Sequence, residues 1–336
     1  TTTFDVVLNN NIFSGNRGYG ASIRATSYEL ATTGLINNEF FSNGRSGAYI
    51  GHRDSVLSMI YASGDSAFAN HGSGISTIQY DNWVSLLNLS GLSSHHNADS
   101  GIHIQQDAEF LSAAVVGMPQ GVSGLLSGLT GLPEELAGFF QPSGGVSASD
   151  NGSSGILAEI SSDSLALGAF FDVAANRNED CGVQALVDSE EGVAIALAGS
   201  SQNLSDLAQL GTDVLGALDV NLPISIPGNG QFQANDNSGC GLVLVTSAED
   251  FALAGVLGAE TSGNENDGTL LFSDSDNIAA ALAARVVASD NGVNGLDLSV
   301  FGDDAAVGLL ADVNASNNGE NGIDATLTGD IAAFLT

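Results

Sequence analysis

The stretch Asn151-Gly152-Ser153-Ser154-Gly155-Ile156 is one copy of a short pattern in which an Asn stands four residues before a Gly that an apolar residue usually follows. Successive Gly residues of the pattern are 27 residues apart in seven of nine intervals, and 54 and 59 apart in the other two. A fixed period of this length is typical of a solenoid. The pattern's ten Asn residues are Asn16, Asn43, Asn70, Asn97, Asn151, Asn178, Asn237, Asn264, Asn291 and Asn318.

The spacing of apolar residues within each repeat favours strands over helices. The first and third residues after the Gly are mostly apolar, as in Gly101-Ile102-His103-Ile104, and a second run alternates later in the repeat, as in Leu165, Leu167 and Ala169. A third short apolar segment precedes the Asn. Because a period of two is the period of a strand, the sequence predicts an all-β solenoid of about ten 27-residue coils, each with three strands, forming one domain over residues 1–336.

The ten Asn residues are expected to have a structural role. Stacked coils place equivalent side chains ~4.8 Å apart, so the amides can hydrogen-bond to one another in a ladder along the rod. The Gly beside each Asn is expected where the backbone needs a positive φ or a close approach.

The Asn-x-x-x-Gly-apolar pattern resembles the right-handed parallel β-helix repeats of the pectin-lyase-like superfamily. The resemblance covers nearly the whole chain and implies a right-handed parallel β-helix. It does not choose an activity, because that superfamily includes polysaccharide lyases, glycosidases, adhesin passenger domains and phage tailspikes.

Composition excludes several classes of partner. The chain has 39 acidic residues, six Arg and no Lys, for a net charge of −33, so binding to nucleic acid is not expected. Residues 1–110 carry a net charge of −5 and residues 111–336 one of −28, and every His, Tyr and Trp lies before residue 104. No apolar run is long enough to predict a membrane span.

The two long intervals predict insertions at 116–142 and 199–229, which leave the solenoid at the same corner. Their apolar residues follow helical spacing, so two helical insertions on one face are expected. These helices either cover one sheet, form a subunit interface or enter a membrane. The interface candidates are Leu125, Leu129, Leu136, Phe139, Phe140, Leu204, Leu207 and Leu210.

Cys181 and Cys240 each stand one residue before the repeat Gly, in consecutive coils. In-register strands place their Cα atoms ~4.8 Å apart, within the range of a disulfide. The sequence therefore predicts a disulfide and, with it, an oxidising extracytoplasmic compartment. Two buried free thiols are the alternative.

Polar residues gather on the first coils, on or just after the first strand. In the superfamily that the repeat resembles, the outer face of this strand is the usual saccharide groove. Neither a lyase nor a glycosidase motif stands out, so no catalytic role is expected. If the chain were a carbohydrate-active enzyme, its site residues would be Arg24, Arg53, Asp54, Asp81, His103 and Asp107, with Tyr49 and His52 beside them.

No cofactor or metal site is expected. His95 and His96 with Asp99 do not complete a tetrahedral zinc set. The acidic turns are expected to attract Ca²⁺ at most weakly, because the calcium-binding β-helix repeat is missing. No glycine-rich phosphate loop leads from a strand into a helix.

These observations lead to three functional hypotheses. The first is a secreted structural protein of the cell surface, which assembles into a filament, sheath or appendage through its ends, its insertions or both. The second is the passenger region of an adhesin that binds glycans or cells. The third is a polysaccharide lyase or glycosidase.

Overall fold

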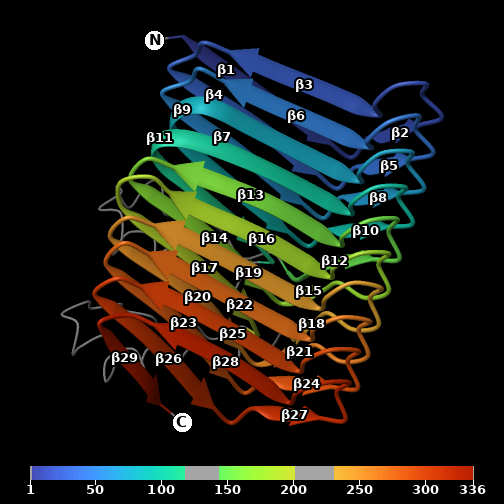
Figure 1. Ribbon diagram of the computed structural model, residues 1–336. Helices are drawn as coiled ribbons and strands as arrows, with labels where there is room; N and C mark the ends of the chain where they lie inside the picture. Colours follow the sequence, from blue (N-terminus) through green and yellow to red (C-terminus); the bar gives the residue numbers. More distant parts are fainter. Residues whose placement is uncertain (1, 118–143, 201–230, 336) are drawn as a thin grey trace.

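The computed structural model describes residues 2–117, 144–200 and 231–335, and these form a parallel β-solenoid of about ten coils (Figure 1). The interface candidates and nearly all of both predicted insertions lie outside the described residues. Within the described part every regular element is a strand, and each coil contributes three strands to the stack.

The first strands of successive coils pair in parallel and form the front of the molecule in Figure 1. They are β3 (Ala21–Thr26), β6 (Ala48–Arg53), the first half of β9 (Ile75–Ser90), the first half of β11 (Ile102–Val116), β13 (Ile156–Ser162), β16 (Val183–Ser189), β19 (Leu242–Ala248), β22 (Thr269–Ser275), β25 (Leu296–Gly302) and β28 (Ile323–Thr328).

The second strands continue the same coils around a tight corner, and β9 and β11 run through it unbroken. They are β1 (Thr3–Asn9), β4 (Leu30–Ile36), β7 (Leu57–Ser63), the second halves of β9 and β11, β14 (Leu165–Phe171), β17 (Val193–Gly199), β20 (Phe251–Leu257), β23 (Ile278–Ala284), β26 (Ala305–Ala311) and β29 (Ile331–Leu335).

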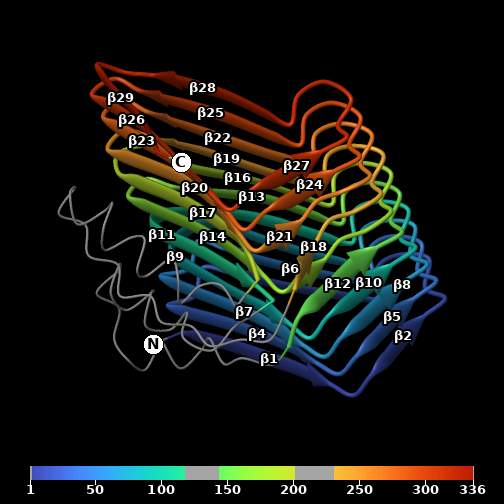
Figure 2. The same cartoon turned by 90° about the horizontal axis from the view of Figure 1, so that it is seen from below.

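The third strands are short and form a ten-stranded sheet that closes the coil, as the end-on view shows (Figure 2). They are β2 (Ile12–Ser14), β5 (Glu39–Phe41), β8 (Ser66–Phe68), β10 (Ser93–His95), β12 (Val146–Ser149), β15 (Val173–Ala174), β18 (Phe232–Gln233), β21 (Ala259–Glu260), β24 (Val287–Ser289) and β27 (Asn314–Ser316).

The Asn ladder is confirmed over its full length. Each Asn donates its side-chain amide to the side-chain oxygen of the next Asn along the rod, in nine bonds of 2.9–3.1 Å. The same oxygen accepts the backbone N–H of the Asn before it, as Asn178 does from Asn151 at 3.0 Å. The ladder therefore satisfies buried backbone donors at a turn where the strand hydrogen bonds stop.

The repeat Gly is required by a close approach. A Cβ atom on Gly155 would lie 2.6 Å from the carbonyl oxygen of Gly182 and 2.8 Å from the side-chain nitrogen of Asn178. No positive φ is found at these repeat positions. Any side chain here would separate the coils at the ladder.

The second sheet has apolar side chains on both of its faces. Its inward positions are mostly small, with Ala166, Ala194, Ala252 and Ala279 all fully buried in the core. Its outward positions carry the larger residues of a separate buried cluster, among them Leu111, Leu167, Ile195 and Leu253. The alternating run at Leu165, Leu167 and Ala169 is thus the outward face of this sheet.

We predict that Asn178→Ala lowers the free energy of unfolding by at least about 2 kcal/mol, because it leaves the buried backbone N–H of Asn151 without its acceptor and removes one bond of the Asn151 side-chain amide. Asn16→Ala is the matched control, since Asn16 is exposed and ends the ladder. Its expected loss is below about 1 kcal/mol. Equal losses in chemical denaturation of the two variants would show that the ladder does not stabilise the interior.

Candidate functional site on the first coils

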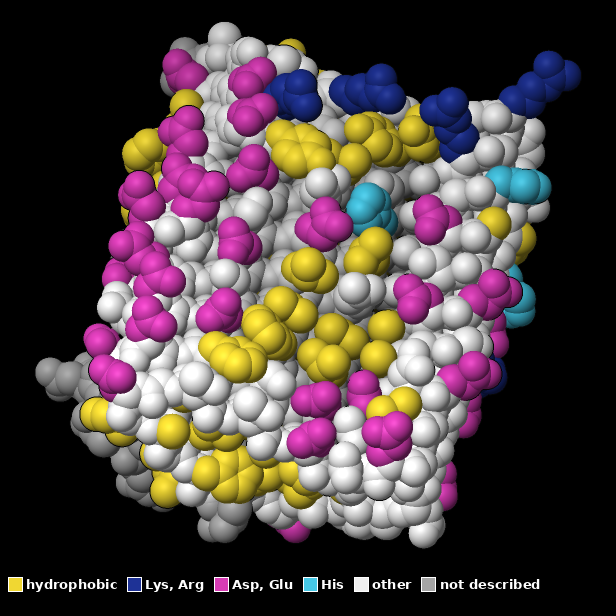
Figure 3. Space-filling model, viewed as in Figure 1, with side chains coloured by type: hydrophobic (Ala, Val, Ile, Leu, Met, Phe, Trp, Pro, Cys, Tyr) yellow, Lys and Arg dark blue, Asp and Glu magenta, His cyan; other side chains and the backbone are white. Residues whose placement is uncertain are grey.

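Side chains alternate between the core and the outer face along the first strands, and this alternation decides which predicted site residues reach the surface. Odd positions after the repeat Gly point into the core and even positions point outward. Arg24, Arg53 and His103 lie on the outer face, in β3, β6 and β11, and Asp54 and Asp81 follow at the corner. Figure 3 shows this outer face, with the basic side chains along its upper edge, over the first coils.

An Arg–Tyr cluster, defined here as Tyr19, Arg24, Arg45 and Tyr49, covers the start of β3 and β6. The Arg24 guanidinium lies 5.1 Å from the centre of the Tyr49 ring, and that of Arg45 lies 5.4 Å from the Tyr19 ring. The two Tyr rings are 5.0 Å apart. Cation–π contacts of this kind hold each guanidinium against a ring while leaving its donors open to solvent.

An aromatic corner, defined here as Val56, Trp83 and Phe110, lies at the far end of the first strands. These residues occupy one position in three successive coils and remain exposed, at 57%, 51% and 40%. The Trp83 and Phe110 rings stack at 5.7 Å with an angle of 10° between their planes. Exposed aromatic rings held parallel form a flat apolar platform on the surface.

Buried polar contacts fix this corner. The side-chain oxygen of Asn82 accepts the backbone N–H of Ser55 at 2.9 Å, and its amide donates to Ser85 at 3.2 Å. Asp54 and Asp81, one coil apart, both adopt a left-handed backbone with φ of 52°. Asp is among the few residues that tolerate this conformation, so the turn chemistry explains both residues.

Charged groups border the platform. Arg53 lies 3.9 Å from Asp81 and 5.8 Å from the centre of the Tyr80 ring, and both partners of the ion pair are more than half exposed. Burial raises the pKa of Asp107, and the nearby Asp81 and Asp163 carboxylates raise it further. The structure therefore brings Arg53, Asp81 and Asp107 together. The predicted candidate Arg24 lies in the Arg–Tyr cluster instead, and His103 contacts Ser76 at 3.4 Å.

His52 is the exception among the polar residues predicted for the outer face. It stands at an odd position of β6, so its side chain points into the core and is 1% exposed. One ring nitrogen contacts the Thr33 hydroxyl at 2.8 Å and the other contacts the Ser58 hydroxyl at 2.9 Å. Gln79 and Gln106 extend this buried polar column into the next two coils.

The predicted disulfide is wrong, because Cys181 and Cys240 are free thiols. Their stacking in consecutive coils is as expected, since the carbonyl of Cys240 accepts the N–H of Gly182, directly after Cys181. The hydrogen bond between the two thiols raises the pKa of Cys181 and lowers that of Cys240. In-register stacking keeps their Cβ atoms near the strand spacing of ~4.8 Å, beyond the ~3.8 Å typical of a disulfide.

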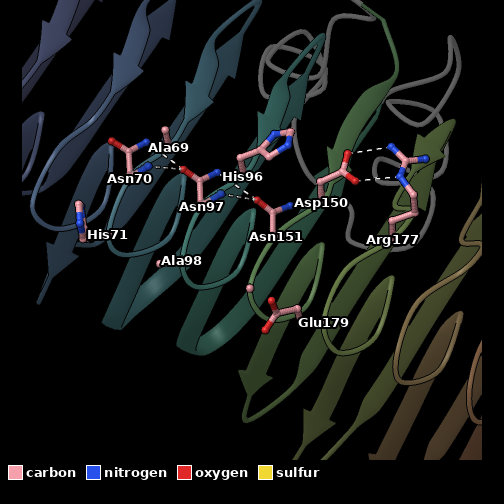
Figure 4. A pocket seen from close by; sticks show the side chains of 11 residues that line it. Ala69, Asn70, His71, His96, Asn97, Ala98, Asp150, Asn151, Arg177 and Glu179 are labelled. Atoms are coloured by element: carbon pink, nitrogen blue, oxygen red, sulfur yellow. Dashed lines mark hydrogen bonds and ion pairs between the residues drawn. The ribbon is translucent and has the colours of Figure 1, made fainter.

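A groove of about 730 Å³ crosses the Asn ladder on coils three to six (Figure 4). Its floor is the row of Asn70, Asn97 and Asn151, and Arg177 holds Asp150 at its edge through two bonds of 2.8 Å. That contact lowers the pKa of Asp150. Because Arg177 and Asp150 already pair and the Asn amides serve the ladder, this groove is a weaker candidate than the corner.

No group of three or more His, Cys, Asp or Glu side chains in the described ranges is arranged to hold a metal ion. His95 stacks on Phe68 at 5.4 Å and its ring contacts that of His96 at 3.0 Å. Burial lowers the pKa of His95. Within the described residues there is also no helix long and apolar enough to cross a membrane.

Comparisons with protein-family models, curated proteins and solved structures find no match to this chain. The aromatic corner was not predicted from the sequence. Its signal is the ninth position after the repeat Gly, which is Val56, Trp83 and Phe110 in consecutive coils and becomes visible only once the repeats are aligned.

We predict that the buried His52 makes stability depend on pH. Burial lowers its pKa from 6.5 to about 4. In the unfolded chain His52 therefore binds a proton below pH 6.5, whereas in the folded chain it binds one only below about pH 4. The free energy of unfolding is expected to fall by roughly 3 kcal/mol as the pH drops through this range.

The measurement is the difference in unfolding free energy between the wild type and His52→Gln from pH 7 to pH 4. Burial raises the pKa of Asp65 to about 6, and this residue titrates with the opposite sign in the same range, so only the difference isolates His52. Parallel curves for the two proteins would contradict the prediction.

Proposed function

We propose that this chain is a secreted, adhesive β-solenoid that binds a neutral polysaccharide at the aromatic corner without cleaving it. The observation that carries the proposal is the exposed, stacked Trp83–Phe110 pair. The apolar faces of sugar rings pack well on such a platform, and large aromatic residues dominate the binding energy of contact surfaces.

The charged groups around the platform support a neutral glycan. Asp54, Asp81, Asp107 and Glu109 surround the corner, where Arg53 is the nearby cation. Carboxylates accept hydrogen bonds from hydroxyl groups, whereas they repel an acidic polymer. The weak Arg53–Asp81 pair leaves the guanidinium free to donate to ring or hydroxyl oxygens.

The geometry also explains the preference for binding over an enzyme. Trp83 and Phe110 remain exposed at 51% and 40%, whereas an active site usually encloses its substrate. Extracellular location is part of the proposal, because a surface glycan would be met outside the cell. Because Cys181 and Cys240 are free thiols, a disulfide no longer supports an extracellular location.

We predict that Trp83→Ala and Phe110→Ala each weaken binding to a neutral polysaccharide at least about tenfold, because each removes half of the platform. The measurement is isothermal titration calorimetry on oligosaccharides from a panel of neutral glucans, mannans and xylans, with polygalacturonate as the acidic comparison. Phe41→Ala is the matched control, since Phe41 stacks on Phe68 at 5.1 Å on the third sheet, away from the corner.

Undiminished binding by both corner variants, or equal loss in Phe41→Ala, would contradict the proposal. Tighter binding of polygalacturonate than of every neutral glycan would contradict its ligand class.

A glycosidase is the second candidate, favoured by the raised pKa of Asp107 beside Asp81. A carboxyl whose pKa is raised beside a second carboxylate is the pairing that such an enzyme needs. Release of reducing ends from a bound glycan, abolished in Asp107→Asn, would establish cleavage. Binding without release would support the adhesive function.

The self-assembling filament stays a prediction. Among the described strands, β2 pairs only with β5 and β27 only with β24, so both ends of the described stack present an open sheet edge. Such an edge pairs with further residues of the chain or with another molecule. Electron microscopy of the purified protein tests the prediction: regular filaments would support it, and separate rods would contradict it.

A further inference from the structure

The outer face of the first sheet changes character along the rod. Beyond the first four coils an apolar patch replaces the Arg–Tyr cluster, and Figure 3 shows these hydrophobic side chains gathered over the middle and lower part of the face. We define the apolar patch as Leu157, Leu186, Val243, Val245, Leu270 and Phe272.

The patch contributes little to the core. Its members sit at even, outward positions. Leu186 is 39% exposed, Val243 is 9% exposed, and the other four are half-buried. The inward positions of the same strands already fill the interior, with Val187 and Leu244 at 1% and 0% exposure. Clusters of exposed apolar residues on a soluble surface usually mark a contact.

Acidic residues form the rim of the patch. Glu159, Asp188 and Asp274 are exposed on neighbouring positions, and burial together with Asp267 and Asp324 raises the pKa of Asp297. An apolar surface with an acidic rim fits a partner surface that combines apolar rings with positive charge.

The chain itself carries one such surface. Six Arg and no Lys make up all its cations, residues 118–143 and 201–230 contain none of them, and four of the six lie before residue 54. The Arg–Tyr cluster joins two of these Arg to two Tyr rings. Arg24 and Tyr49 lie in the same outward columns as the patch, and Tyr19 and Arg45 lie in the turns just before β3 and β6. Arg and Tyr are also the residue types most enriched at the centres of interfaces.

We propose that two copies of this chain pair antiparallel through the outer faces of their first sheets, so that the Arg–Tyr cluster of each covers the apolar patch of the other. A twofold axis parallel to the strands, between β11 and β13, places β3 opposite the partner's β22, β6 opposite β19, and β9 opposite β16. Such an interface is isologous and closes as a dimer.

The residues brought into opposition are complementary. In the shared register, Arg24 faces Phe272, with the Asp274 and Asp297 carboxylates diagonal to it. Ile78 faces Leu186, and Gln105 faces Glu159.

No carboxylate on these eight strands opposes another carboxylate. In the third outward column, Asp188 faces Tyr80, Asp274 faces Thr26, and Asp107 faces Ser161. Tyr80 can donate its hydroxyl to Asp188 across the interface. No two carboxylates are therefore directly opposed in this face, and the like charges nearest to each other are Asp107 of one copy and the diagonal Glu159 and Asp188 of the other.

The contact is large enough for a stable dimer. Eight strands at ~4.8 Å spacing and six residues at ~3.3 Å per residue cover roughly 38 Å by 20 Å. The resulting area of roughly 800 Å² per partner matches that of standard protein interfaces.

This inference goes beyond glycan binding, and Trp83 and Phe110 take no part in it. Failure of the dimer would therefore leave the glycan measurement untouched, and the reverse also holds. The test is the molar mass of the full chain by sedimentation equilibrium, with an expected mass twice the 33.9 kDa of one chain.

Arg24→Glu and Phe272→Arg are each expected to weaken the dimer at least about tenfold. The first substitution places a carboxylate toward the acidic rim, and the second sets a new guanidinium of one copy against Arg24 of the other. The double variant restores an attractive pair at both contacts, and its dissociation constant is expected within about threefold of the wild type. Val287→Arg is the matched control, since Val287 is 41% exposed on the third sheet.

A wild-type monomer at tens of micromolar would overturn the proposal. Equal weakening by Val287→Arg, failure of the double variant to recover, or a larger oligomer that ignores all these substitutions would overturn it as well. Circular dichroism of each variant shows whether it is folded, and a misfolded variant is replaced by Tyr49→Glu against Val243→Arg, the neighbouring opposed pair.

Discussion

The hydrogen-bond ladder of Asn side chains is the interaction on which the rest of the structure depends. At the turn before each first strand the sheet hydrogen bonds are interrupted, and the Asn oxygen takes over the backbone donor of the coil before it. Because each Asn side chain hydrogen-bonds to the Asn of the next coil, the ladder fixes the register between neighbouring coils. That register places outward side chains of successive coils directly above one another, which is how isolated residues of the sequence become continuous columns on the surface.

Much of the fold could be predicted from the sequence, because the Asn and Gly residues of the ladder recur at a fixed spacing. The pattern around Asn151 and Gly155 recurs at a fixed spacing, and the odd and even positions after the Gly predict which side chains face the core. Applied to β3 and β6, this rule puts Arg24 and Arg53 on the surface and His52 in the core, as the structure does. Polarity alone does not separate His52 from the outward residues beside it. The resemblance to parallel β-helix proteins was likewise sound for the architecture, while no comparison confirms the superfamily.

Other features depend on geometry that a repeat pattern does not encode. The spacing of Cα atoms between coils is compatible with a disulfide between Cys181 and Cys240, but both are free thiols, because in-register side chains run parallel and keep their Cβ atoms near the strand spacing. The second sheet carries apolar residues on both faces, so alternation alone could not show that Leu167 points outward and Ala166 inward. Aligned repeats bring Val56, Trp83 and Phe110 to one position, but the parallel stacking of the Trp83 and Phe110 rings depends on side-chain packing that the alignment does not show.

The same regular register groups side chains of one kind on neighbouring coils of the rod. Aromatic and basic residues lie on the first coils, and apolar and acidic residues on the later ones, so the proposed glycan platform and the proposed dimer surface share one scaffold. The most direct test of this account is a crystal structure of the chain with the tightest-binding neutral oligosaccharide. The account predicts a sugar ring stacked on Trp83 and Phe110 with its hydroxyl groups toward Asp54 or Asp81. An oligosaccharide bound in the groove over Asn97 and Asn151, with the aromatic corner empty, would contradict it.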